Sequence, residues 1–505
     1  MDRLAALASL GCLTVALLAA CQGNDTSEQA PTSNGTGGAG GSSSQMASAG
    51  GMAVASGGMA AASGGMAPIP CSEDCDDALV CNGIETCDTT VGECVAGVPI
   101  ACGDDDICNG IETCTEPMGE CTTPVAPACP KAPSACGQSG GIGSPSAGEL
   151  DATSAAGFRL VDTDSWQSSE NIIKQIAAHP STTPSTVGDI VKSALNRTGN
   201  AISVSGLGCF FDGFEWNTGD GDVDYWWPQG VTGSTGPYDN TIDKGKLDGR
   251  RVMMVSWYHK AEEDPNTSTY KGVRVSIVDH TSTQTIKYRH VLLVEPIMVG
   301  NTATYRPLAS KSSSLHAGGI AWVGDYLYIA STSSGFRVFD TRHIMHVATG
   351  DKQLVGYQFG KDEYHAYNYA YILPQVGAYT LCASTCCSRF SFVSLDTSTT
   401  PKSLLAGEYV SSSFVGRLHR WPIDEKTDRL LVEGGGVQSN QALFPGVTNM
   451  QGAMSYQGSY FVSSSKPKLG LKPSTGSFHH GALGGSTKAH RYPYLPEDLY
   501  FGKYT

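Results

Sequence analysis

Short apolar runs dominate the larger, C-terminal part of the chain. Stretches such as RVMMVSWYH, GVRVSIVDH, YRHVLLVEP, GIAWVGDYLYIAST, RFSFVSLD and GAMSYQGSYFVSSS are rich in β-branched or aromatic residues and are bounded by Gly, Asp, Ser or Pro. Consecutive short strands without intervening helices predict antiparallel meanders. We therefore expect a mainly β domain over residues 151–505.

The start of this domain follows a helical pattern instead. Ile172, Ile173 and Ile176 recur at helical spacing within SENIIKQIAAH, which predicts a helix on the N-terminal side of the strands. The stretch TVGDIVKSAL predicts a second, shorter helix.

Three glycines mark a long repeat among the predicted strands. Gly230, Gly318 and Gly452 are 88 and 134 residues apart, and Pro496 lies 44 residues beyond Gly452. A unit of about 45 residues is the size of one four-stranded blade of a β-propeller. The pattern favours a β-propeller of five to seven blades over a β-sandwich. The ring would be closed either by a strand near AISVSGLGCFF or by further strands after PEDLY.

Ligands of a propeller bind where the loops that lead into its innermost strands converge. The ligand-binding candidates at these positions are Trp226, Trp227, Gln229 and Gln451, and the catalytic candidates are His316, His365, Glu497 and Asp498. If the last four converge, they could hold a divalent metal or act as acid and base. The alternative is structural, with these side chains joining neighbouring sheets by hydrogen bonds.

The first twenty residues have the pattern of an export signal. A basic residue, Arg3, precedes an apolar run that ends at Ala20 and is short for a membrane span. The sequence Leu-Ala-Ala-Cys that ends at Cys21 resembles a bacterial lipobox, which implies lipidation of Cys21 and attachment to a membrane through acyl chains. We expect an exported lipoprotein of the outer membrane or cell surface. The alternative is a plain signal peptide cleaved at the same place.

Residues 21–70 are mostly Gly, Ser, Ala, Thr and Met, and GGMA recurs at Gly50, Gly57 and Gly64. This composition cannot form a core and predicts a disordered tether. Copper binding by the methionines is the alternative, but each of these residues stands singly among glycines.

Residues 71–136 contain eleven cysteines, and residues 137–150 form a Gly/Ser/Pro linker. Two 27-residue units have the same spacing of 6, 6, 7 and 8 residues between cysteines. Their members are Cys75, Cys81, Cys87, Cys94, Cys102, Cys108, Cys114, Cys121 and Cys129. Such short units need covalent links, so disulfides are the favoured interpretation. Zinc is disfavoured because its ligands usually come in pairs two to four residues apart.

Acidity is concentrated in the same segment. Between residues 71 and 136 there are 13 Asp and Glu against one Lys, a balance of −12 out of −15 for the whole chain. This charge disfavours nucleic acid as a partner of the segment, because the two would carry like charge. Four acidic residues there are calcium candidates, with solvated loops as the alternative: Asp104, Asp105, Asp106 and Glu112. We expect no other cofactor.

Two resemblances follow from these motifs. The repeated CNGIETC is similar to Cys-rich repeats in surface proteins of slime moulds and myxobacteria. HAGGIAWVGDYLYIASTSSGFRVFDTRHI and PEDLY resemble a family of uncharacterised secreted bacterial proteins with a propeller-like domain. Together they resemble a myxobacterial-type lipoprotein and imply display outside the cell.

The common catalytic signatures are missing, including GxSxG, HExxH, a phosphate loop and a dinucleotide fingerprint. The sequence therefore favours a surface-anchored lipoprotein that displays a binding or scaffolding domain for a glycan or protein ligand on a disulfide-stapled stalk. The alternative is an extracytoplasmic hydrolase of a carbohydrate or lactone, with its site at the channel mouth.

Overall fold

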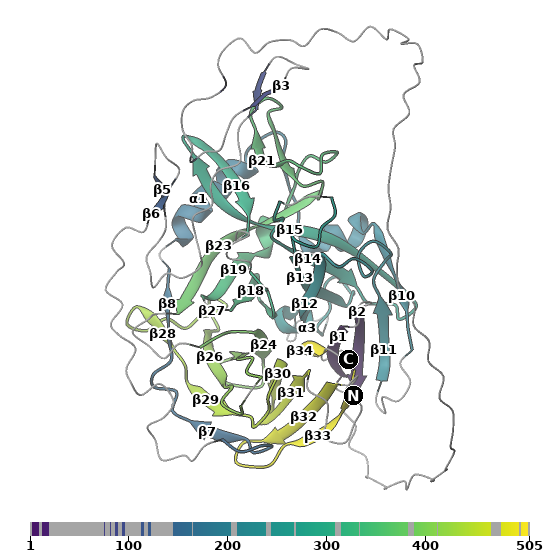
Figure 1. Ribbon diagram of the computed structural model, residues 1–505, viewed down its shortest axis with the longest axis vertical. Helices are drawn as coiled ribbons and strands as arrows, with labels where there is room; N and C mark the ends of the chain where they lie inside the picture. Colours follow the sequence, from purple (N-terminus) through teal and green to yellow (C-terminus); the bar gives the residue numbers. More distant parts are fainter. Residues whose placement is uncertain are drawn as a thin grey trace, which may run out of the picture.

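The body of the chain is built almost entirely of β-strands, as Figure 1 shows for a computed structural model. The structure describes residues 3–9, 13–19, 75, 81, 86–88, 93–95, 113–115, 120–122, 145–163, 165–203, 210–238, 244–266, 269–308, 315–332, 334–381, 388–411, 413–465, 476–493 and 496–502. The prediction of a mainly β fold is confirmed.

The helices are short and lie mostly ahead of the main sheets. They are α1 (Trp166–Ala177), α2 (Val187–Asp189), the π-helical turn η2 (Ile190–Ala194), α3 (Thr235–Tyr238) and the 3-10 turn η3 (Thr341–His343). Ile173 and Ile176 of α1 are buried in the core, which confirms the predicted helix. The hydroxyl of Thr186 accepts a hydrogen bond from the Asp189 N–H at 3.1 Å, and the Asp189 carboxylate accepts one from the Thr186 N–H. This capping box fixes the start of α2.

Four antiparallel meanders make up most of the body. The first contains β12 (Trp226–Gly233), β13 (Val252–His259), β14 (Val273–Asp279) and β15 (Thr285–Val299), followed by β16 (Thr302–Pro307). The second contains β17 (Ile320–Val323), β18 (Tyr326–Ser331), β19 (Gly335–Asp340) and β23 (Tyr371–Leu381). The third contains β24 (Phe392–Asp396), β25 (Ser403–Gly407), β26 (Leu418–Asp424) and β29 (Gln441–Phe444). The fourth contains β30 (Met450–Tyr456), β31 (Ser459–Ser464), β32 (Gly476–Ala482) and β33 (Lys488–Tyr492).

A further set of strands combines the two ends of the sequence. The last strand, β34 (Pro496–Gly502), pairs with β1 (Arg3–Ser9), and β2 (Leu13–Ala19) joins β1 to β11 (Phe210–Glu215) and β10 (Arg197–Ala201). Hydrogen bonding then continues from β10 through β15, β14 and β13 to β12, which contacts β1. Apart from β34, these are eight strands that form a nearly closed, barrel-like sheet. The larger sheet to which they belong is mixed, because β15 also pairs in parallel with β23.

The first strands of the four meanders and β34 contact one another in a closed order. β12 lies against β17, β17 against β24, β24 against β30, β30 against β34, and β34 against β12. Glycine permits this close approach at two of the recurring positions. A Cβ at Gly230 would lie 2.6 Å from the Ile320 nitrogen, and one at Gly452 would lie 2.6 Å from the Asp498 Cα. The repeat in the sequence thus marks where neighbouring sheets touch.

The remaining strands are short and cover edges of these sheets. They are β7 (Asp151–Thr153), β8 (Arg159–Asp162), β9 (Thr183–Pro184), β20 (Met345–His346), β21 (Val355–Gln358), β22 (Glu363–Ala366), β27 (Arg429–Leu430) and β28 (Gly436–Gln438). Hairpin β21–β22 packs against β16 at the outer side of the first meander.

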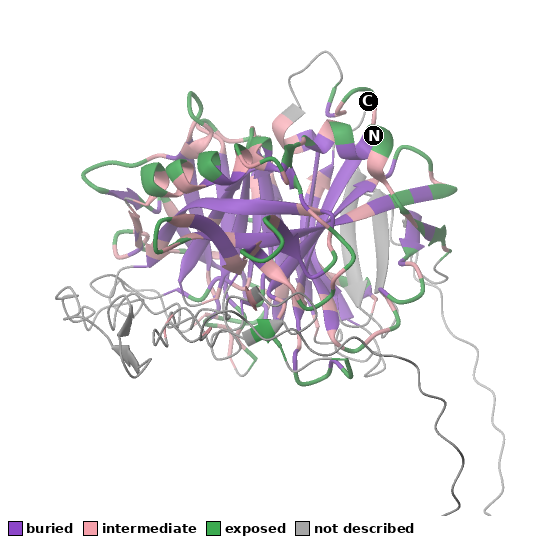
Figure 2. Ribbon diagram, turned by 90° about the horizontal axis from the view of Figure 1, so that it is seen from above, coloured by how far each residue is buried: buried purple, intermediate pink, exposed green. Residues whose placement is uncertain are grey.

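The core lies between the sheets. Figure 2 shows the strands largely buried and the exposed positions concentrated in loops and helices. Trp257, Trp322 and Trp421 are each at most 1 % exposed and come from three different meanders. None of the described helices is long and apolar enough to cross a membrane.

The cysteine segment forms two small hairpins in the same register. In the first, β3 (Thr86–Asp88) and β4 (Glu93–Val95) place Cys87 opposite Cys94, and in the second, β5 (Thr113–Thr115) and β6 (Glu120–Thr122) place Cys114 opposite Cys121. A disulfide joins Cys75 to Cys94, and Cys81 and Cys87 are disulfide-bonded as well. Disulfide bonding is therefore confirmed for the first unit.

Candidate functional site

Several of the predicted site residues gather where β12 and β34 begin. We define the mouth group as Trp227, Gln229, Tyr258, Lys260, His316 and Glu497. The rings of Tyr258 and His316 lie 4.4 Å apart, and the Lys260 ammonium lies 4.0 Å from the Trp227 ring centre. Tyr258 and Lys260 were not predicted, although Tyr258 stands near the end of the predicted strand RVMMVSWYH and Lys260 directly follows it.

The mouth group holds a carboxyl group that is protonated at neutral pH. Burial raises the pKa of Glu497 to about 8, although a hydrogen bond with Gln229 acts in the opposite direction. His316 is an exposed residue. Desolvation of its ring by the surrounding protein lowers its pKa, and the positive charge of Lys260 lowers it further. The mouth group thus combines a neutral acid with a largely neutral imidazole.

Asp498 has a different environment from its neighbour Glu497. Its carboxyl group accepts hydrogen bonds from the Val231 and Ile320 N–H groups, each at 3.3 Å, and burial raises its pKa well above the ordinary value. These contacts join β34 to β12 and β17. The side chain is fully buried, which fits the structural alternative for this residue.

The four catalytic candidates do not form one site. His365 lies on β22, with its imidazole 3.2 Å from Glu363 and its carbonyl accepting from the Tyr305 hydroxyl. In the part of the chain that the structure describes, no three His, Cys, Asp or Glu residues are arranged to hold a metal ion. Gln451 is half-buried on β30. The calcium candidates at 104–106 and 112, and the lipidation candidate at 21, lie outside the described residues.

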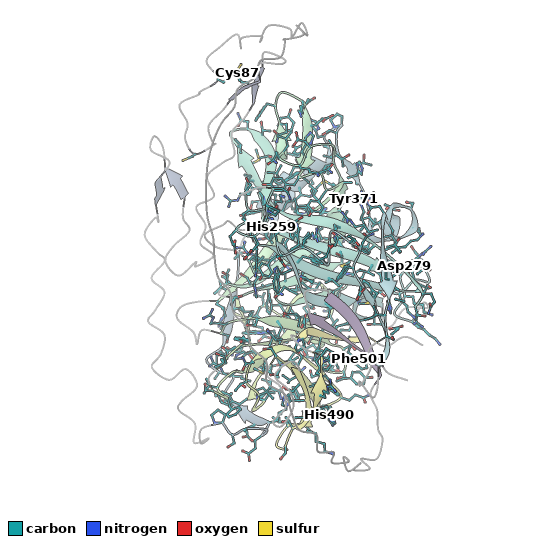
Figure 3. All side chains as sticks on the ribbon, turned by 45° about the vertical axis from the view of Figure 1, so that its right-hand side comes forward. Cys87, His259, Asp279, Tyr371, His490 and Phe501 are labelled. Carbon is teal, nitrogen blue, oxygen red and sulfur yellow. A yellow bond between two sulfur atoms is a disulfide. The ribbon has the colours of Figure 1, made fainter. Side chains whose placement is uncertain are left out.

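A second site, which the sequence did not reveal, is a cavity of about 330 Å³ beside the first meander. Its walls come from β10, the β11–β12 loop, the start of β12, the β13–β14 loop, β14, β15, the β20–β21 loop and the segment before β23. Trp226, predicted as a ligand-binding residue, lies in this wall and is 5 % exposed. His259 and Tyr371, labelled in Figure 3, contact the wall residues Asp264 and Arg289.

Cations outnumber carboxylates around the cavity. Its cationic wall residues are Arg197, Lys271, Arg274, Arg289 and Lys352, and its acidic ones are Asp220 and Asp264. Burial alone raises the pKa of Asp264, but bonds from Lys271, the Asn266 backbone and His259 hold it at about 2. Both carboxylates are therefore ionised at neutral pH, and the wall carries a net charge of +3, five minus two.

Asp220 is the centre of a buried network. It accepts hydrogen bonds from Arg197 at 2.8 Å and from the Tyr288 hydroxyl at 2.6 Å, and His290 lies 3.0 Å away. Burial tends to raise the pKa of Asp220, but the hydrogen bond with His290 and the nearby positive charge of Arg274 outweigh it, so the pKa is lowered. Burial and the charge of Arg274 lower the pKa of His290 to about 3, which leaves this ring neutral at pH 7.

Ser276, His290 and Asp220 form a series that resembles a hydrolytic triad. Ser276 Oγ lies 2.9 Å from His290 Nδ1, and it accepts a hydrogen bond from the Trp257 indole at 2.8 Å. Ser276 is fully buried and does not line the cavity. A substrate carbonyl cannot reach its hydroxyl, so this series is a structural network.

Arg274 is the most deeply buried cation of the cavity wall. Its side chain is 4 % exposed and lies over the rings of Trp226 and Trp257, at 4.3 and 4.6 Å. Nη1 donates to the Tyr369 hydroxyl at 3.1 Å, and Nη2 lies 3.5 Å from Asp220. Nε and Nη2 make no hydrogen bond within the described part of the chain. Buried N–H groups without a hydrogen-bond partner are rare in native proteins, so those of Arg274 require an explanation.

Neither the models of known protein families nor the curated proteins match this chain. The function has to be argued from the mouth group and the cavity.

Proposed function

We propose that the four meanders are four blades of a five-bladed β-propeller and that β34 begins the fifth blade. What supports this is the closed order of β12, β17, β24, β30 and β34, each the first strand of its set. Of the glycines that recur in the sequence, Gly230 and Gly452 lie on these strands and Gly318 just precedes β17, at points where backbones approach closely. Five is within the range of five to seven blades that the repeat length implies.

We also propose that the protein is exported and anchored as a lipoprotein at Cys21, as in the lipoproteins that the sequence resembles. In the structure, residues 3–9 pair with β34 and residues 13–19 pair with β11. The same segment is therefore either removed as a leader or kept as two strands of the sheet. Intact-mass analysis of the membrane-extracted protein distinguishes them. We expect a chain that begins at residue 21 and carries acyl groups, and an unprocessed N-terminus would contradict the proposal.

The function supported best is binding of a small ligand or glycan by a displayed domain. The cavity beside the first meander carries this proposal, because it combines polar and aromatic walls with a buried arginine whose N–H groups are only partly used. Its volume of about 330 Å³ lies at the lower end of the range for small-molecule sites, about 300–1,000 Å³. The acidic stalk would hold this domain away from the membrane, and nucleic acid is not a partner.

Screening of the purified full chain on a glycan array, with calorimetry of the hits, tests this proposal. We expect specific binding that is lost in Trp226→Ala, where one aromatic wall of the cavity is removed. A Trp227→Ala variant is the matched control, since its ring belongs to the mouth group. Binding that is unchanged in Trp226→Ala but lost in Trp227→Ala would move the site to the mouth group.

Hydrolysis is a second candidate because of Glu497. A carboxyl group with a pKa near 8 can donate a proton to the leaving oxygen of a glycosidic or lactone bond at neutral pH. Chromogenic glycosides and lactones test this idea. Turnover by the full chain that Glu497→Gln abolishes would support the hydrolase, and absence of turnover on every substrate would leave binding as the function.

A further inference from the structure

We infer that the cavity beside the first meander binds an anionic monosaccharide, meaning a single sugar that carries a carboxylate or a phosphate group. This inference rests on the proposed binding function and names its ligand class. The charge of the cavity, its aromatic side chains and a local backbone conformation support it.

The charge of the cavity is opposite to that of the whole protein. The chain carries a net charge of −15, whereas the cavity wall carries +3. Arg274 is held in a low-dielectric environment, where an uncompensated charge is costly. The Asp220 carboxylate is already engaged by Arg197, Tyr288 and His290, so it only partly compensates Arg274. An acid group in the cavity would supply the missing negative charge.

Three cations at the wall can contact such a group. The Lys271 ammonium uses one donor for Asp264 at 2.9 Å, and Arg289 Nη1 donates to the Ala194 carbonyl at 3.1 Å. Each of these side chains has additional N–H groups. Lys352 is exposed at the rim, where it can attract an anion before it enters.

Aromatic side chains form the other part of the wall. Trp226 and Tyr369 lie with ring centres 6.3 Å apart and nearly perpendicular planes, and Tyr225 and Tyr367 also line the cavity. Trp226 and Tyr367 are buried, whereas Tyr225 and Tyr369 are half-buried and can contact the C–H groups of a sugar ring, and Asn196 and Gln353 offer amides for its hydroxyls. A polar ligand with a flat apolar face fits these walls better than an inorganic anion does.

The segment that closes the cavity has an unusual backbone. Tyr367 and Asn368 are consecutive non-glycine residues with positive φ, +50° and +69°. The Asn368 side chain holds the turn by accepting a hydrogen bond from the Gly350 N–H at 2.7 Å. Conformations of this kind are costly for residues other than glycine and concentrate at ligand-binding sites.

Calorimetry with the purified full chain tests the inference with D-glucuronate, D-glucose 6-phosphate, D-glucose and inorganic phosphate. We expect at least one of the two sugar acids to bind about tenfold or more tightly than glucose and inorganic phosphate, since a charge-assisted contact is worth about 1.5–3 kcal/mol. Binding of glucuronate would identify the acid group as a carboxylate, and binding of glucose 6-phosphate would identify it as a phosphate. Affinity should fall as NaCl is raised from 50 to 500 mM.

Variants locate the binding. Arg289→Gln should weaken the sugar acid about tenfold, and Lys352→Gln should weaken it severalfold because that residue is exposed. Lys192→Gln, which removes an exposed lysine paired with Asp248 away from the cavity, is the matched control and should leave the affinity unchanged.

The outcomes separate this inference from the proposed function. A neutral sugar that binds as tightly as the acids, with no effect of Arg289→Gln, would overturn the inference and leave the binding function standing. Inorganic phosphate that binds as tightly as glucose 6-phosphate would overturn the role of the sugar ring. Failure of the four probes and of a full glycan array to bind would overturn both.

Discussion

Two buried arginines, Arg420 in the third meander and Arg274 in the first, have similar burial but different bonding. All three guanidinium nitrogens of Arg420 donate hydrogen bonds, to Asp396, Ser403, Ser455, Tyr460 and Gln441, at distances of 2.7–3.3 Å. Arg274 donates one hydrogen bond, to Tyr369, among the described residues. Arg420 is 7 % exposed and Arg274 is 3 % exposed.

The difference in bonding distinguishes a charge with a structural role, that of Arg420, from a charge that a ligand can use, that of Arg274. A buried cation with every N–H engaged stabilises a single arrangement of strands and has nothing left to offer. A buried cation with unused donors is less well compensated, and Arg274 is beside a cavity. The difference lies in their neighbours, since both residues are arginines within β-strands.

The largest expected effect is that of Arg420→Met. Removal of the cation leaves the Asp396 carboxylate buried without its partner, so the free energy of unfolding should fall by about 3–5 kcal/mol in urea denaturation. Arg306→Met, which breaks a half-buried pair with Glu295, is the control and should cost about 1 kcal/mol or less. An equal loss in both variants would show that the Arg420 network contributes no more than a surface pair.

Arg274→Met should have a smaller effect on stability. Asp220 keeps its bonds from Arg197 and Tyr288, so we expect a loss of about 1–3 kcal/mol by the same measurement. Ligand affinity should fall much more than in Arg420→Met when both are measured on folded protein. A larger loss of stability in Arg274→Met than in Arg420→Met would contradict the structural role of Arg420.

Acid titration tests the network around Asp220. The lowered pKa of this carboxyl group means that its stabilising contribution is present above its unfolded pKa, about 3.9, and is lost as the pH falls towards the folded value. The Asp220→Asn variant lacks this pH-dependent contribution to stability. Its Tm should therefore be well below that of the wild type at pH 7, with the gap narrowing at pH 3. A gap independent of pH would contradict the proposed ionisation.

The smallest effects should come from the matched pair Tyr460→Phe and Tyr369→Phe. Each removes one hydroxyl bonded to a buried arginine and should reduce the free energy of unfolding by about 1 kcal/mol. Only Tyr369→Phe should alter sugar-acid affinity in calorimetry. An equal change in affinity in both variants would mean that the cavity is not the binding site.

Local patterns predicted the local structure well. Strands and the first helix follow from apolar spacing, which acts within a few residues. The glycines at 230 and 452 were recognisable because tight contact between strands excludes a side chain, whatever the partner strand is. The cysteine repeat predicted the disulfide bonding found in its first unit, although the pairing of Cys75 with Cys94 was not deducible.

The candidate sites were predicted only in part. Gln229, His316 and Glu497 lie in the mouth group, but His365 lies on the outer hairpin β21–β22. The position of His365 relative to the predicted strands did not indicate that this residue lies on a separate hairpin. The cavity was missed because its wall is assembled from segments between residues 196 and 370 that share no motif.

The sequence by itself determined the class of the fold, the position of α1 and the acidic cysteine segment, because each depends on composition or on short-range spacing. The tertiary structure decided which charges are satisfied and which line a cavity. Arg274 and Arg420 cannot be distinguished by their flanking residues, since hydrogen bonds to a buried guanidinium come from strands far apart in sequence. Long-range packing sets that difference.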